Sequence, residues 1–235
     1  MIILAIAITI IMGIFGARLL GLSKEFGALT GGAISICGAS AAMAITSILP
    51  DHKDKDRNLS LAVVGITAIS TLEMIAYPFA GPLLGLEGPE MGMFLGGTIH
   101  DVAQTAGAGY SVSEEVGKMA VLTKMVRVSF LLPVVIILMM VFKERATSKK
   151  AAVPVPFFLC AFFIFMVIAS IAPLPEYFAN AMGVISKTAL TIAIAAIGLK
   201  TNIKDVLAVG PKPMILMGIQ ALCMAVIVLM CILYL

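Results

Sequence analysis

The stretch that decides the fold class is Ile2 to Leu20, IILAIAITIIMGIFGARLL, in which Arg18 is the only ionisable side chain. About 20 apolar residues of helix span a bilayer. Comparable apolar runs cover 27–49, 60–84, 91–110, 119–142, 155–172, 178–199 and 213–235. These runs are too long and too uniformly apolar for barrel strands, which alternate. The sequence therefore predicts an all-α, polytopic integral membrane helix bundle.

The composition agrees with this prediction. Of the 235 residues, 61% are hydrophobic and 12% charged, against roughly half and a quarter in soluble domains. Because no soluble domain or linker separates the runs, residues 1–235 are expected to form a single transmembrane domain. The positive charges lie in short clusters between apolar runs, which is the usual pattern of cytoplasmic loops in multi-pass membrane proteins. Lipid is the expected surrounding, and nucleic acid is not expected as a partner.

Two of the runs contain an internal repeat. The segment GGAISICGASA at 31–41 aligns with GGTIHDVAQTA at 96–106, and each copy precedes a polar loop and a long helix with a proline, Pro78 or Pro133. Repeated, glycine-interrupted helices carry the binding site in many secondary transporters. The alternative is chance, because small residues recur wherever membrane helices pack closely.

Charge distinguishes two arrangements of these segments. If all eight runs cross the membrane, the loop 51–57 lies opposite the basic clusters at 143–150 and 200–212. If the two repeated segments are re-entrant, all three clusters share one side, which fits the positive-inside rule better. The re-entrant arrangement brings the two repeats in from opposite faces. It puts these loops in the cytoplasm and both termini outside.

Ionisable residues within apolar runs are functional candidates by default. Helix N-termini suit anions, so a small anion is expected between the broken helices, with a proton or a sodium ion as coupling ion. The substrate-binding candidates are Gly31, Gly32, Ser35, Ser40, Gly96, Gly97, Thr98, His100, Gln104 and Lys187. The ion-coupling candidates are Asp101 and Glu73.

Each candidate also has a structural interpretation. Glu73 and Lys187 could pair with each other in a salt bridge or with polar neighbours. Asp101 could cap a half-helix, and His100 could be a hydrogen-bonded residue at a helix end. Arg127, near the outer third of its run, is expected to reach the interface.

Enzyme chemistry is not indicated. The sequence contains no HExxH, no GxSxG with an evident base, no Walker loop and no dinucleotide fingerprint. No cofactor or metal is expected, because the four cysteines lie singly within apolar runs.

Three motifs, SICGASA at 35–41, GTIHDVAQ at 97–104 and IGLKTN at 197–202, closely resemble the YeiH family of bacterial and archaeal membrane proteins, often labelled sulfate exporters. The resemblance covers essentially the whole chain. It implies an inner-membrane protein akin to the bile-acid-symporter-like transporters with inverted repeats, and a sulfate-like anion as substrate. Glu73 stands where the family leads us to expect a small or apolar residue, so no family role is carried onto it.

Family members usually have a further N-terminal part with a helix that resembles IGLKTN. A homo-oligomer or a companion membrane chain is therefore expected to complete this chain. The alternative to a transporter is a non-transporting membrane subunit that needs such a partner chain.

Overall fold

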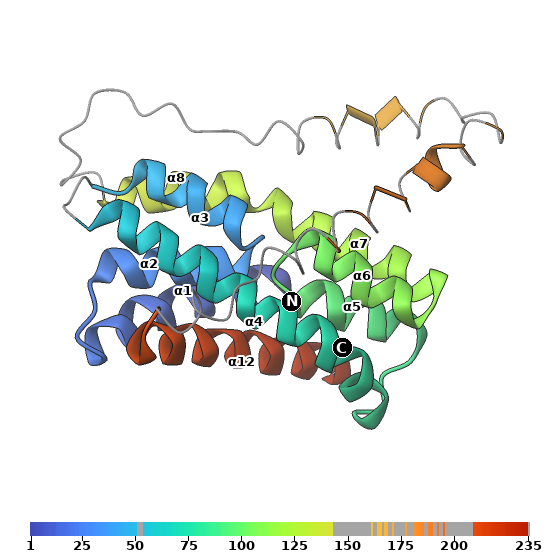
Figure 1. Cartoon of the computed structure of the whole chain (residues 1–235), viewed down its shortest axis with the longest axis horizontal. Coiled ribbons are helices and arrows are strands. Elements are labelled where there is room, and N and C mark those ends of the chain that lie inside the picture. Colours follow the sequence, from blue (N-terminus) through green and yellow to red (C-terminus); the bar gives the residue numbers. More distant parts are fainter. Residues whose placement is uncertain are drawn as a thin grey trace.

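A computed structural model of the chain describes residues 1–50, 54–142 and 209–234, together with scattered residues between 161 and 195. Every regular element in these ranges is an α-helix (Figure 1). The helices are α1 (Ile2–Leu19), α2 (Lys24–Ser35), α3 (Ala39–Ile48), α4 (Lys55–Leu83), α5 (Gly88–Thr98), α6 (Val102–Val112), α7 (Glu114–Ser129), α8 (Leu131–Phe142) and α12 (Pro211–Tyr234). The all-α prediction is confirmed. The expected helices at 155–172 and 178–199 and the clusters at 143–150 and 200–208 lie outside the ranges with continuous description.

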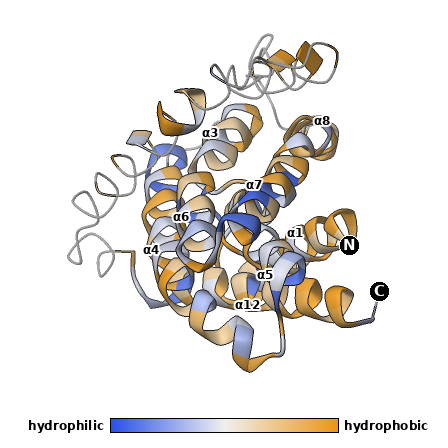
Figure 2. Cartoon of the chain, turned by 90° about the vertical axis from the view of Figure 1, so that its right-hand side faces the viewer, coloured by the Kyte–Doolittle hydropathy of each residue, from blue (hydrophilic) through white to orange (hydrophobic). Residues whose placement is uncertain are grey.

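Four stretches are long and apolar enough to cross a membrane: α1, α4, α7 with α8, and α12. Their outward faces carry large apolar side chains, with Leu19 89% and Leu83 88% exposed. In Figure 2, α1 and α12 are mainly orange. Exposed leucines of this kind are stable in lipid and costly in water, so these faces are lipid-facing.

The first repeated segment forms a hairpin that enters and leaves at one end of the bundle. Helix α2 runs inward, the chain breaks at residues 36–38, and α3 returns to the same end (Figure 1). At that end Lys55 Nζ donates to the Leu49 carbonyl beyond α3 at 2.9 Å, and the Lys24 ammonium lies 5.5 Å from the Phe142 ring at the end of α8.

The second repeated segment forms a matching hairpin from the opposite end. Helix α5 runs inward, the break spans residues 99–101, and α6 returns. Both arms pack on the first turns of α7. A Cβ added to Gly92 of α5 would meet Met119, and one added to Gly109 of α6 would lie 2.9 Å from Gly117. The two hairpins point toward each other, as the re-entrant arrangement predicts.

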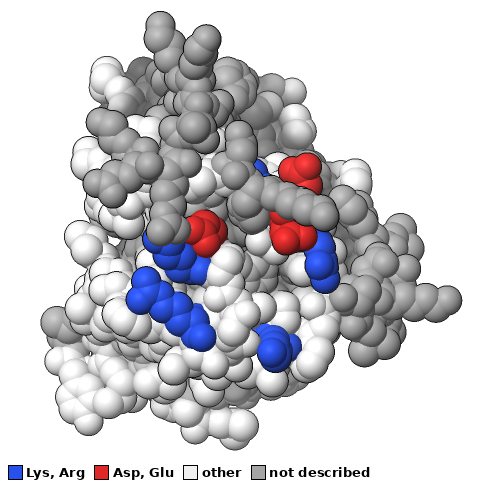
Figure 3. Space-filling view, turned by 90° about the vertical axis from the view of Figure 1, so that its left-hand side faces the viewer, with Lys and Arg blue, Asp and Glu red and all other residues white. Residues whose placement is uncertain are grey.

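Basic side chains gather at the end where α2 enters. Figure 3 shows this end with Lys and Arg spread over it and a few acidic groups between them. A hollow of about 530 Å³ there is lined by residues from the α1–α2 turn and from the starts of α4 and α12, among them Ser23, Arg57 and Lys212. The described ends of the three basic loops therefore share one end of the bundle, and α1 begins and α12 ends away from it, in the opposite half (Figure 1).

Candidate functional site at the hairpin tips

The tip of the first hairpin leaves helix carbonyls without intrahelical partners. The last four carbonyls of a helix lack such partners, and here they belong to residues 32–35 of α2. The Gly32 carbonyl accepts from Ser35 Oγ at 3.2 Å, and the Ala33 carbonyl accepts from the Gly38 N–H at 2.8 Å. The Ser35 carbonyl accepts from Arg127 Nε at 2.6 Å, and the Ile34 carbonyl accepts from Nη2 of the same arginine. Arg127 thus supplies hydrogen-bond donors to the last two carbonyls of α2.

The same guanidinium also binds the tip of the second hairpin. Arg127 Nη1 donates to the carbonyls of Gly97 at 3.0 Å, Thr98 at 3.4 Å and Ile99 at 3.1 Å. One side chain of α7 therefore joins two helix C-termini that are far apart in the sequence. Each such terminus carries about half a negative charge, which a guanidinium stabilises.

A second basic side chain lies beside the first. Lys124, one turn before Arg127 on α7, donates from Nζ to the Ile99 carbonyl at 2.6 Å. Both side chains are 0% exposed. The tips therefore meet around two buried basic side chains.

The prediction for Arg127 is wrong. An apolar run that starts at residue 119 places Arg127 close to one end of the helix, and so close to the membrane–water interface. The helix begins at Glu114, after Ser113 accepts a hydrogen bond from the Val116 N–H as its N-cap. Arg127 then lies about 20 Å along the helix at about 1.5 Å per residue. Lys124 was missed for the same reason, although a serine followed by two glutamates is a recognisable helix-start signal.

The backbone N–H groups that follow the second break are hydrogen-bonded by the side chains of Ser70 and Asp101. Ser70 Oγ, from the middle of α4, accepts from the backbone N–H groups of His100 at 3.1 Å and Asp101 at 3.2 Å. The Asp101 carboxylate accepts from the N–H groups of Ala103 at 2.8 Å and Gln104 at 3.1 Å. Asp101 is thus the N-cap of α6, which agrees with the structural alternative for this residue. By contrast, Gly38, the N-cap residue of α3, makes no side-chain hydrogen bond to that helix.

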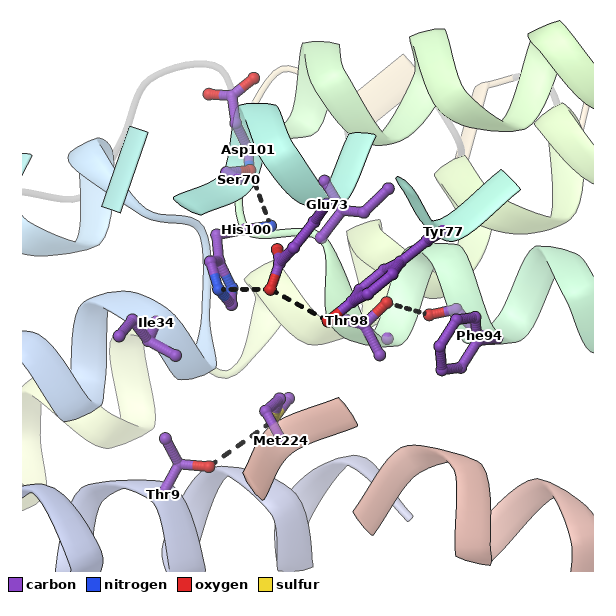
Figure 4. Close-up of polar contacts among 12 residues, drawn as sticks. Thr9, Ile34, Ser70, Glu73, Tyr77, Phe94, Thr98, His100, Asp101 and Met224 are labelled. Carbon is purple, nitrogen blue, oxygen red and sulfur yellow. Dashed lines mark hydrogen bonds and ion pairs between the residues drawn. The ribbon is translucent and has the colours of Figure 1, made fainter. Parts of the chain in front are cut away.

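His100 lies between Arg127 and Glu73, and Figure 4 shows its contact with Glu73. Its Nδ1 lies 3.5 Å from Arg127 Nη2, and its Nε2 lies 3.3 Å from Glu73 Oε1. A guanidinium only donates hydrogen bonds, so Nδ1 must act as the acceptor, and we infer that Nε2 carries the proton toward Glu73. The second contact has an ion-pair distance but not hydrogen-bond alignment. A neutral imidazole fits this position better than a protonated one.

Glu73 is buried with an incomplete set of partners. Its Oε1 accepts from the Tyr77 hydroxyl at 3.3 Å, whereas Oε2 has no hydrogen-bond partner among the described residues. The Gln104 side chain donates to Thr71 Oγ1 at 2.8 Å, and its Oε1 is likewise without a partner in this part of the chain. Because unpaired buried acceptors are costly, both oxygens are suited to a proton donor or a small cation.

The remaining candidates are hydroxyl residues near the tips, the two glycine pairs and Lys187. Ser35 and Thr98 contribute their carbonyls, because their hydroxyls donate within their own helices. Ser40 lies half-buried at the start of α3. The glycine pairs lie within α2 and α5 rather than at the breaks. The glycine that a break requires is Gly38, with a φ of 65°. Lys187 lies outside the described residues.

The glycine pairs allow close helix packing. A Cβ on Gly31 would lie 2.9 Å from the Ile10 Cα of α1, and one on Gly96 would lie 2.4 Å from the Ala120 carbonyl oxygen of α7. The second glycines would meet Ile45 of α3 and Val228 of α12. These contacts set how deeply each hairpin inserts, and the second glycine of each pair also contributes its carbonyl to the tip.

Comparison with known proteins gives one family throughout. A family described as "Conserved hypothetical protein 698" matches residues 1–217. UPF0324 membrane protein CT0845 of Chlorobaculum tepidum is 43% identical over 97% of the chain, which covers 65% of that relative. UPF0324 membrane protein RB0971 of Rhizobium meliloti is 44% identical over 96% of the chain and 66% of the relative. UPF0324 membrane protein TauZ of Paracoccus denitrificans is 39% identical over 95% and 67%.

The chain thus spans about two thirds of the length of these relatives. No solved structure matches it.

Proposed function

We propose that this chain, which belongs to the family described as "Conserved hypothetical protein 698", forms the membrane core of a secondary transporter for a small anion. Its relatives are named membrane proteins, and the resemblance to the YeiH family is confirmed by these matches. One observation carries the proposal: two hairpins enter from opposite ends and meet around buried charges. Irregular backbone at membrane depth is tolerated where it is buried or lines a cavity, and such breaks form the substrate sites of many transporters.

Buried charge favours transport over a purely structural bundle. The described tips bring together Arg127, Lys124, Glu73 and Asp101. Ionisable groups at membrane depth are expensive and mark ion pathways and proton relays. Ser40 and Asp101 remain half-buried, not sealed, so an ion could reach this side of the tips.

The anion is proposed to bind at the start of α3. Its N-cap residue, Gly38, makes no side-chain hydrogen bond to the helix, and N–H groups at a helix start favour anions. The start of α6 is already satisfied by Asp101. This differs from the sequence expectation of two equivalent N-termini, because a side-chain carboxylate already caps one of them.

The carboxylates of Asp101 and Glu73 couple the binding of the anion to the binding of a proton or a sodium ion. An anion near Asp101 or Glu73 disfavours their ionised forms, so it binds more tightly when a proton or a sodium ion is present there. Such coupling is reciprocal: the anion strengthens cation binding by the same factor. The proposed substrate is a sulfate-like anion, and the proposed location is the cytoplasmic membrane.

Uptake of radiolabelled sulfate into liposomes containing the purified chain tests this proposal. We expect an inward proton or sodium gradient to accelerate uptake, and Glu73→Gln to lose about tenfold or more of that acceleration, as expected for a positioned proton-transfer or ion-binding group. Glu115→Gln, which changes an exposed carboxylate on α7, is the matched control and should transport normally.

Uptake equal to that of empty liposomes for sulfate and for small organic anions would contradict the proposal. Flux that appears only after a second membrane chain is added would instead identify this chain as a subunit.

A further inference from the structure

We propose that the Arg127 guanidinium is a built-in cation that ties the carbonyl ends of the two hairpin tips together, in the place where a transporter of this design could hold a metal ion. This assigns Arg127 a positioning role that does not depend on the identity of the substrate. It goes beyond the proposed function, which concerns the anion and the coupling ion.

The carbonyls around Arg127 form a cation site built from both repeats. Five of them accept from this one side chain, two at the end of α2 and three at the end of α5. Rings of backbone carbonyls at interrupted helices are the ligands that transporters use for sodium. Here the Arg127 guanidinium, a cation that is part of the chain itself, binds these carbonyls.

The geometry specifically requires a guanidinium. Arginine has five N–H groups in a planar fork, and in this site Nε, Nη1 and Nη2 all contact acceptors. Nε and Nη2 reach the first tip, and Nη1 reaches the second. A lysine carries three N–H groups at a single point and could not bind both tips in this way.

Two consequences follow from full occupancy. First, Arg127 has no N–H group left to bind a transported anion, so it positions the tips and does not take part in substrate recognition. Second, a sodium ion cannot use these carbonyls while the guanidinium is in place. If sodium is the coupling ion, the described residues leave it the carboxylates of Glu73 and Asp101 and the side-chain oxygen of Gln104.

Chemical rescue with guanidinium chloride tests this proposal on the purified, detergent-solubilised full chain. Arg127→Ala removes the cation and leaves the carbonyls facing a space that matches a free guanidinium ion. At about 10 mM, far below the molar range that unfolds proteins, guanidinium should raise the apparent Tm of this variant by about 3 °C or more. Choline chloride at the same concentration should not.

The wild type and Arg57→Ala are the controls. Arg57 is exposed at the basic end, so removing it creates no buried carbonyl site and guanidinium should not stabilise that variant. Folded Arg127→Ala that responds equally to guanidinium and choline would overturn the proposal.

A second variant covers the case in which Arg127→Ala does not fold. Arg127→Lys keeps the charge but loses the fork, and its apparent Tm should fall by about 5 °C or more. A Tm equal to that of the wild type would show that charge alone suffices, and the built-in-cation role would be wrong.

Discussion

Replacing Ser70 by alanine removes one oxygen that holds the second hairpin tip. Ser70 is 0% exposed, and its Oγ accepts from two backbone N–H groups, those of His100 and Asp101. A buried donor left without its acceptor costs about 1–3 kcal/mol. Two such donors give a loss of about 2–6 kcal/mol, and we expect about 3 kcal/mol after partial relaxation.

The assay is the apparent Tm of the purified protein in detergent. For a chain of this size, about 1 kcal/mol corresponds to about 2–4 °C, so Ser70→Ala should melt about 6–12 °C below the wild type. Ser129→Ala is the matched control, because Ser129 Oγ only donates to the Met125 carbonyl within its own helix, and its Tm should stay within about 2 °C. Equal shifts for the two variants would refute the role assigned to Ser70.

Two further predictions concern glycines. Gly27→Ala should lower the apparent Tm by several degrees, because the new Cβ would lie 2.3 Å from the Gly13 carbonyl oxygen, whereas Gly218→Ala, with nothing within 4 Å, should leave it unchanged or slightly raised. Gly38→Ala should cost about 1–3 kcal/mol in thermal unfolding, because the φ of 65° is one that L-residues rarely adopt. A Gly27→Ala protein as stable as Gly218→Ala would contradict the close approach of α1 and α2.

The hairpins could be predicted from the sequence because two independent signals agreed. The repeat at 31–41 and 96–106 marked the interruptions, and the positive-inside rule selected the re-entrant arrangement. The structure has breaks at 36–38 and 99–101, a few residues beyond the glycine pairs. The offset arises because the pairs serve helix packing, while the breaks depend on Gly38 and on the Asp101 cap.

The position of the two basic side chains at the tips, Lys124 and Arg127, could not be predicted from hydropathy alone. The start of α7 is polar, with Glu114, Glu115 and Lys118, so an apolar-run criterion begins the helix too late. Lys124 and Arg127 then resemble end-of-helix residues. Only the tertiary approach of two helix C-termini gives these side chains carbonyl partners, and no local pattern in α7 encodes that approach.

The partner of Glu73 is a similar case. From the sequence its candidates were Lys187 or polar neighbours, and the described structure places it against His100 and Tyr77. His100 follows the second glycine pair at a position set by the break, so its proximity to α4 depends on how far that hairpin inserts. The predicted contribution of Lys187 to the site remains a prediction.

The opposed hairpins are the central claim, and sided cysteine labelling in a cysteine-free background tests it most directly. Single cysteines at Ser23 and Asp56 flank the α2–α3 hairpin, and single cysteines at Glu87 and Ser113 flank the α5–α6 hairpin; all four positions are exposed. In intact cells, a membrane-impermeant maleimide should label the Glu87 and Ser113 positions, whereas the Ser23 and Asp56 positions should label only after the membrane is opened. Labelling of Ser23 and Asp56 from opposite sides would mean that α2 and α3 cross the membrane, and would contradict the account.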